Sequence, residues 1–304
     1  MTFRPDTNGW SNAAGAKAGN IPKNNISSVD EFHMDLKNEM VKNFKNDGFY
    51  IAKGIINEDE IGSIFENVLQ NYLKRNTSSE CTNEVTRIDS TLLNQEMIKF
   101  REENLETFSE IYDACQSSVS LVNLITSRKI SEISTRLLDC EISQLSHSGN
   151  MIRMDPPYDT RNKTAWHQEI AFVRNPGLVL WIPLVEMTDD IGPLHILKKS
   201  HLEGEIVIER NNINDYTSSR VSQTEIPDEI LEKFEDSAVE IEKGDALFFD
   251  HKLIHKSGDN TSKRIRFSCQ TRYMNSVLDD FASFRPGTSY NPHSMKRVNR
   301  KMYD

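Results

Sequence analysis

Apolar residues recur at helical spacing through the N-terminal half of the chain. They lie three or four positions apart in "SVDEFHMDLKNEMVKNFKNDG" (residues 28–48), in "NEDEIGSIFENVLQNYLKRN" (57–76) and between about 105 and 138. This period predicts amphipathic helices, the second of them capped by Asn57 or Asp59. Between the first two, "FYIAKGII" is short and apolar, as expected for a strand. We therefore predict a helical N-terminal layer that carries one short strand.

From about residue 141 to 275 the pattern changes to short alternating or wholly apolar runs, such as "GNMIRM", "LVLWIPL", "ALFFD" and "IRFSCQTRYM". Pro, Gly, Asn and Asp separate these runs, which is typical of an antiparallel sandwich or barrel. A polar stretch over about 203–237 interrupts them and is long enough to be a lid. Residues 1–28, rich in Asn, Gly, Ala and Ser, are expected to be irregular. We predict an α+β fold with a single domain over 29–304.

The composition adds little to the prediction of the fold, but it argues against some functions. The 304 residues carry a formal net charge of −10, whereas nucleic-acid-binding proteins usually present a basic face. No apolar run reaches the roughly 18 residues of a membrane span, and the N-terminus lacks the apolar core of a secretory signal. Four cysteines are scattered without zinc-ligand spacing: Cys81, Cys115, Cys140 and Cys269. We expect a cytoplasmic protein with neither nucleic acid nor membrane as a partner.

The segment "TAWHQEIAFV" holds the first candidate site residues. His167 and Glu169 lie two positions apart, so on a strand both side chains point to the same side. An imidazole and a carboxylate together suit Fe(II), Mn or Zn. The third ligand has to come from another strand; His255 is the candidate, and His251, which shares its parity, is the rival. The alternative is that His167 and Glu169 are polar residues on the exposed face of a strand, because His-x-Glu often occurs by chance.

A second group of candidates lies in "ALFFDHKLIHKSGDNTSKRIRFSCQTRY". If the turn-forming "SGDNTS" closes a hairpin, His255 lies opposite Arg266, and Ser257 points into the same cavity. An arginine with a nearby hydroxyl can hold the far carboxylate of a 2-oxo acid through charge-assisted hydrogen bonds. Arg264 shares the parity of Arg266 and is the alternative anchor, although a solvated arginine is the default for that position.

Together these elements resemble the phytanoyl-CoA dioxygenase family of Fe(II)- and 2-oxoglutarate-dependent oxygenases. "WHQE" resembles the family's Trp-His-Gln-Asp element at the metal, and "LVLWIPLVEMTDDIGPLHILKKSH" resembles the next strand and Gly-Pro turn. "GDALFFDHKLIHKSGDNTSKRIRFSCQTRY" resembles the final element, and "NDGFYIAKGIINEDEI" resembles the opening strand and helix. The resemblance covers about residues 38–275. It implies a double-stranded β-helix (jelly-roll) core over about 141–275.

The resemblance also implies roles for particular residues. His167, Glu169 and His255 would hold Fe(II), and Arg266 with Ser257 would bind the far carboxylate of the cosubstrate 2-oxoglutarate. The implied activity is hydroxylation of a small metabolite or natural-product intermediate by O2, with decarboxylation of 2-oxoglutarate to succinate and CO2. In such an enzyme the metal supplies the difficult chemistry, and the protein supplies the geometry.

Two positions depart from the family pattern. Glu169 replaces the usual Asp, which keeps the carboxylate but places it one methylene further out. Asp155, in "MIRMDPP", stands where many members carry Lys, so a contact to the cosubstrate is missing or comes from elsewhere. Arg153, Arg174 and Arg272 could meet an anionic substrate group, but we expect all three at the surface.

Other functions stay open at this point. A metal-binding or ligand-binding jelly-roll module without oxygenase chemistry would have no need of Arg266 and Ser257. A radical halogenase requires a small residue in place of Glu169, so that chloride can bind the metal. Desaturation or ring formation on the same scaffold depends on how the substrate is placed, which the sequence does not indicate.

Overall fold

The computed structural model describes most of the chain between residues 38 and 278. The chain divides into two compact units, Met1–Glu39 and Met40–Asp304, and nearly all the described residues belong to the second. The described residues are 38–76, 91–159, 163–170, 172–173, 176–206 and 226–278. The irregular segment predicted over 1–28 and most of the lid predicted over 203–237 lie outside them.

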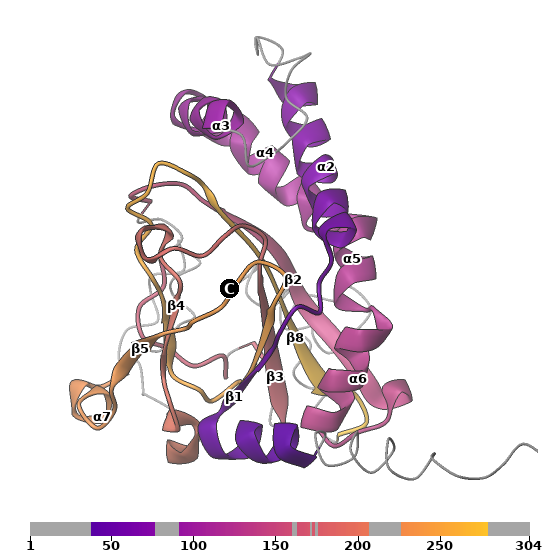
Figure 1. Ribbon diagram of the computed structural model, residues 1–304, viewed down its shortest axis with the longest axis vertical. Coiled ribbons are helices and arrows are strands. Elements are labelled where there is room, and N and C mark those ends of the chain that lie inside the picture. The colour runs from indigo at the N-terminus through magenta and orange to yellow at the C-terminus, as the bar shows by residue number, and fades with distance from the viewer. Residues whose placement is uncertain are drawn as a thin grey trace, which may run out of the picture. The chain divides into compact units, whose positions relative to one another are not determined.

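Two antiparallel sheets form the β part of the protein (Figure 1). In the first, five strands follow the order β1 (Phe49–Ala52), β6 (Ala246–Asp250), β3 (Gly177–Pro183), β8 (Arg266–Asn275) and β2 (Leu145–Asp155). In the second, three strands follow the order β5 (Asp236–Ala238), β4 (Leu194–Leu197) and β7 (His255–Ser257). Neighbouring strands are far apart in the sequence in both sheets. The expected α+β class with antiparallel strands is confirmed.

Helices pack on the five-stranded sheet (Figure 1). They are α2 (Glu58–Arg75), α3 (Thr91–Glu103), α4 (Leu105–Cys115), α5 (Val119–Ile125) and α6 (Arg128–Leu137). The last three contact β2, and α2 contacts α4 and α5. A further helix covers residues 38–47. Shorter helical segments are α7 (Asp228–Leu231) and the 3₁₀ turns Ile142–Gln144, Asp189–Ile191 and Ser200–Glu203. None of the helices that the structure describes has both the length and the hydropathy to cross a membrane.

The N-terminus of α2 shows how the local sequence determines where a helix begins. The side chain of Asn57 accepts a hydrogen bond from the Glu60 backbone N–H, and the Glu60 carboxylate accepts one from the Asn57 N–H, both at 2.9 Å. This capping box pairs two donors that the first turn of a helix cannot pair itself. Asn57 is therefore the cap, and not Asp59. Helix α3 was not predicted from the sequence.

Strand β8 is buried along most of its length and separates two environments. Phe267, Cys269 and Tyr273 belong to the apolar core beneath the helices. Phe65 of α2 packs edge-on against Phe267 at a ring distance of 5.4 Å, and the Tyr273 hydroxyl donates to the backbone carbonyl of Ile125 in α5. Because side chains alternate along a strand, the intervening positions face the other way. These positions are polar: Arg266, Ser268, Gln270 and Arg272.

The predicted hairpin between β7 and β8 is wrong. β7 pairs with β4, where His255 lies opposite Ile196, whereas β8 pairs with β2, where Arg266 lies opposite Asp155. The connection crosses from one sheet to the other and is held by Asn260, whose side-chain amide donates to the Asp155 carbonyl at 2.9 Å. Turn-forming residues mark a reversal of the chain but not the sheet in which the next strand pairs. His255 and Arg266 still line one pocket, because that pocket lies between the sheets.

We predict that Gly258→Ala lowers the free energy of unfolding by about 1–3 kcal/mol, the usual cost of overpacking. A Cβ atom at Gly258 would lie 2.1 Å from the carbonyl oxygen of Pro193 and 2.8 Å from the carbonyl carbon of Gly192, and backbone atoms on both sides leave no room to adjust. Urea denaturation measures the change. Gly62→Ala in α2 is the control, since nothing lies within 4 Å of the added atom there. That control should be at least as stable as the wild type, because alanine is the better helix former. A Gly258→Ala variant as stable as the wild type would contradict the close approach.

Candidate metal centre

His167, Glu169 and His255 come together between the two sheets, and we call them the candidate triad. His167 and His255 exchange backbone hydrogen bonds of 3.0 and 3.1 Å, and the Glu169 N–H donates to the carbonyl of His251 at 2.8 Å. The His167 contact is an isolated bridge outside the named strands, so the prediction that His167 and Glu169 lie on a regular strand is wrong. Both side chains nevertheless face β7, because the bridge fixes their direction.

The two imidazoles of the triad have the same orientation. Nδ1 of His167 lies 2.8 Å from the carbonyl oxygen of Ala165, and Nδ1 of His255 lies 2.9 Å from that of Leu253. A carbonyl oxygen can only accept, so each Nδ1 carries the proton and each Nε2 offers a lone pair. Both Nε2 atoms lie 3.6 Å from Oε1 of Glu169. Three potential ligand atoms therefore lie within 4.8 Å of one another.

The pKa shifts of Glu169 and His255 also favour the binding of a cation. Burial raises the pKa of Glu169, but Arg272 and the two histidines outweigh it and hold the pKa well below its usual range. Burial, helped by the proximity of His167, lowers the pKa of His255. An ionised carboxylate and neutral imidazoles are the forms in which these groups bind a divalent metal.

His251, the rival of His255 in the sequence, is buried but lies apart from the triad. Its Nδ1 is 3.2 Å from both the Gly177 carbonyl and a carboxylate oxygen of Asp250. Its Nε2 is 3.7 Å from a carboxylate oxygen of Glu205. Within the described part of the chain, the triad is the single group of three such side chains whose ligand atoms could meet at one metal.

The pocket around the triad is small, about 50 Å³, and mixes apolar and charged walls. Ser257 lies in it, and its Oγ is 2.8 Å from Oγ1 of Thr164. Trp181 and Leu194 form apolar walls. The charged and amide groups on the walls are Arg153, Arg266, Gln270 and Arg272.

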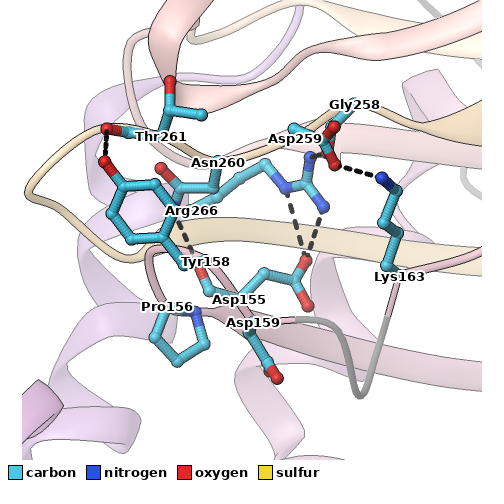
Figure 2. Close-up of a pocket in the computed structure, with 10 residues that line it drawn as sticks. All are labelled: Asp155, Pro156, Tyr158, Asp159, Lys163, Gly258, Asp259, Asn260, Thr261 and Arg266. Carbon is cyan, nitrogen blue, oxygen red and sulfur yellow. Dashed lines mark hydrogen bonds and ion pairs between the residues drawn. The ribbon is translucent and has the colours of Figure 1, made fainter.

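Arg266, the predicted anchor, lies in this pocket. Its side chain is already paired, as Figure 2 shows in a neighbouring cavity that Arg266 also lines. Its Nε and Nη2 donate to one oxygen of Asp155 at 3.3 and 3.0 Å, and its Nη1 donates to the carbonyls of Gly192 and Gly258. Arg153 donates two more hydrogen bonds to Asp155, both of 3.1 Å. Burial opposes ionisation of Asp155, but the two arginines outweigh it and lower its pKa. The guanidinium groups of Arg153 and Arg266 thus share the single carboxylate of Asp155.

A larger cavity of about 330 Å³ shares Arg266 as a wall (Figure 2). It lies between the segment after β2 and the β7–β8 connection. There the Tyr158 hydroxyl donates to the Thr261 carbonyl at 3.2 Å, and Lys163 pairs with Asp259 at 2.6 Å. Arg266 therefore stands between this cavity and the pocket of the triad.

Three polar residues of this region were not predicted from the sequence. Arg153 and Arg272 were expected at the surface, but both are buried beside carboxylates; Arg174 lies outside the described residues. The Ser268 hydroxyl is buried without a hydrogen-bond partner among the described residues, on the same side of β8 as Arg266. The alternation Arg-x-Ser-x-Gln-x-Arg within an otherwise apolar strand is the signal that could have identified them.

Comparison with known proteins places this geometry in a family. A sequence profile of the phytanoyl-CoA dioxygenase (PhyH) family matches residues 44–268. No curated protein sequence matches the chain.

Solved structures share the fold. SnoK, a non-heme alpha-ketoglutarate-dependent carbocyclase from nogalamycin biosynthesis, is 19% identical, with a TM-score of 0.55 over 85% of this chain and 90% of SnoK. The epimerase SnoN, in complex with Fe3+, alpha ketoglutarate and nogalamycin RO, is 18% identical, with a TM-score of 0.54 over 85% of this chain and 93% of SnoN. EctD from S. alaskensis, with bound Fe, is 16% identical, with a TM-score of 0.52 over 82% and 78%. Since the family profile spans residues 44–268 of 304, triad included, the chain belongs to the phytanoyl-CoA dioxygenase family of iron- and 2-oxoglutarate-dependent oxidoreductases.

Proposed function

We propose that this protein hydroxylates a small metabolite or natural-product intermediate, using Fe(II), O2 and 2-oxoglutarate and releasing succinate and CO2. The observation that carries the proposal is the triad. Two imidazoles and one ionised carboxylate present three ligand atoms within 4.8 Å of one another, in a pocket between two sheets. This donor set leaves octahedral positions of Fe(II) open for other ligands.

The protein's own residues prepare the site for the metal. The carbonyls of Ala165 and Leu253 fix the tautomer of each histidine, so both lone pairs already point inward. Phe249 packs its ring 4.6 Å from that of His255, and Trp181 and Leu194 provide apolar walls that limit water. Bound Fe(II) would supply the activation of O2 and of 2-oxoglutarate, for which the chain has no side chain of its own.

Arg266 is the proposed partner of the far carboxylate of 2-oxoglutarate, with Ser257, which lines the same pocket, as a further donor. Asp155 occupies two N–H groups of Arg266, so the cosubstrate has to replace it there. The exchange leaves Asp155 paired, because Arg153 holds both of its oxygens. A buried carboxylate without a partner would be costly, and this arrangement avoids that cost.

Alternative functions are less well supported. A metal-holding module that binds no anion would not need Arg266 in this pocket, because Arg153 already pairs with both oxygens of Asp155. Glu169 fills the position that a halogenase leaves to chloride. SnoK and SnoN are a carbocyclase and an epimerase, so the shared fold alone does not determine the product.

Product analysis tests the proposal directly. Small-molecule pools are incubated with the protein, Fe(II), 2-oxoglutarate and air, and followed by mass spectrometry. Hydroxylation gives a substrate-dependent gain of one oxygen with matching succinate. A loss of two hydrogens would indicate desaturation or ring formation instead, and no succinate from any pool would refute the oxygenase proposal.

We predict that His255→Ala abolishes succinate formation, whereas His251→Ala leaves a folded protein that binds metal. Of these two histidines, His255 places Nε2 3.6 Å from Oε1 of Glu169, whereas Nε2 of His251 faces Glu205. Mn(II) binding and succinate formation measure the difference. The opposite result would mean that the metal lies at His251.

We predict that Arg266→Ala raises the apparent KM for 2-oxoglutarate at least tenfold while metal binding persists. Loss of a buried charge-assisted partner commonly costs about 2–5 kcal/mol, and about 1.4 kcal/mol corresponds to tenfold. Arg266→Lys should restore the KM only in part, because an ammonium cannot form a planar two-pronged contact. Arg264→Ala is the matched control. A large rise in KM for Arg264→Ala, with none for Arg266→Ala, would move the anchor to Arg264.

A further inference from the structure

Arg272 of β8 holds the outer oxygen of Glu169. Its Nε and Nη2 both lie 2.9 Å from Oε2 of Glu169, while Oε1 faces the two histidines. Both side chains are less than a tenth exposed. The two oxygens of one carboxylate therefore have different partners. Resting on the proposed function, we propose that Arg272 is a positioning residue that fixes Glu169 as a metal ligand through Oε1 alone.

The neighbouring backbone is shaped around this arginine. Nη1 of Arg272 donates to the Gly149 carbonyl at 3.1 Å. Gly149 has a φ of +63°, and a Cβ atom there would lie 2.7 Å from that same Nη1, so a side chain at this position would displace the guanidinium. The register of β2 against β8 shifts between Ser148 and Met151, next to the contact. The ring of Phe172 lies under the guanidinium at 5.0 Å. Four separate features therefore converge on Arg272.

The length of Glu169 fits the same arrangement. Arg272 and the histidines lie on opposite sides of the carboxylate, and Glu169 reaches both with its two oxygens. An aspartate is one methylene shorter, so its carboxylate would have to give up one partner. Glu169→Asp should then lose either the Arg272 contact or correct placement toward the metal.

The sign of the effect separates positioning from simple electrostatics. Arg272 places a positive charge close to a divalent cation, so at a pH where Glu169 stays ionised its removal alone would, by Coulomb's law, strengthen metal binding. If Arg272 acts by orienting Glu169, its removal weakens metal binding. Loss of such an outer partner of a metal ligand typically costs about 10–100-fold in affinity.

Mn(II) affinity, measured from the electron paramagnetic resonance signal of the free ion, tests the proposal on the full chain without turnover. Wild type, Arg272→Gln, Arg272→Lys, Glu169→Asp and the Arg272→Gln/Glu169→Asp double variant are compared, and near-ultraviolet circular dichroism reports folding. Arg128→Gln is the matched control. It breaks an exposed Arg–Glu pair of 2.7 Å on α6 and should leave the Kd unchanged.

We expect Arg272→Gln to raise the Kd for Mn(II) at least about tenfold. Arg272→Lys, which keeps a cation beside the buried carboxylate, should raise it less and serves as the test if the glutamine variant does not fold. The increase in Kd for the double variant should be smaller than the product of the two single increases, because both substitutions break the same contact between Arg272 and Glu169.

A Kd that is unchanged or lower in both Arg272 variants would overturn the proposal, as would independent effects in the double variant. Absence of Mn(II) binding by the wild type would refute the proposed metal site itself. The two failures are therefore distinguishable.

Discussion

The pairing of buried charges between the two sheets is the constraint on which the rest of the site depends. Two carboxylates, Asp155 and Glu169, and three arginines, Arg153, Arg266 and Arg272, are largely excluded from solvent. A buried charge without a partner is strongly destabilising, so each carboxylate is paired with arginine. One positive charge remains in excess. A divalent cation and a doubly charged dicarboxylate that bind together would leave this excess unchanged.

The need to pair buried charges also explains why one side of β8 is polar and the other is apolar. Arg266 and Arg272 face the pocket, while Phe267 and Tyr273 face the helices. The outer side is apolar and would be exposed without the helical layer, which Phe65 of α2 joins to the strand. The helices therefore contribute to the site although none of the triad lies on them. They bury one side of the strand whose other side carries the arginines.

Some of this organisation is local in the sequence and could be predicted, and some is not. The helical period and Asn57 lie within one segment, as do His167 and Glu169, so short patterns suffice for α2 and for two of the three triad residues. Arg272 was expected at the surface, because an isolated arginine usually is. Its burial depends on Glu169, which lies 103 positions away in the sequence. The sheet in which β7 pairs is likewise set by strands remote from the turn that follows it.

The central claim is that the triad holds Fe(II) with positions left open for 2-oxoglutarate. It is tested most directly by adding Fe(II) and then 2-oxoglutarate to the wild-type protein under anaerobic conditions and recording the visible spectrum. The account predicts a metal-to-ligand charge-transfer band that requires both additions and saturates at one Fe(II) per chain. A protein that binds Fe(II) but shows no such band at saturating 2-oxoglutarate would contradict it.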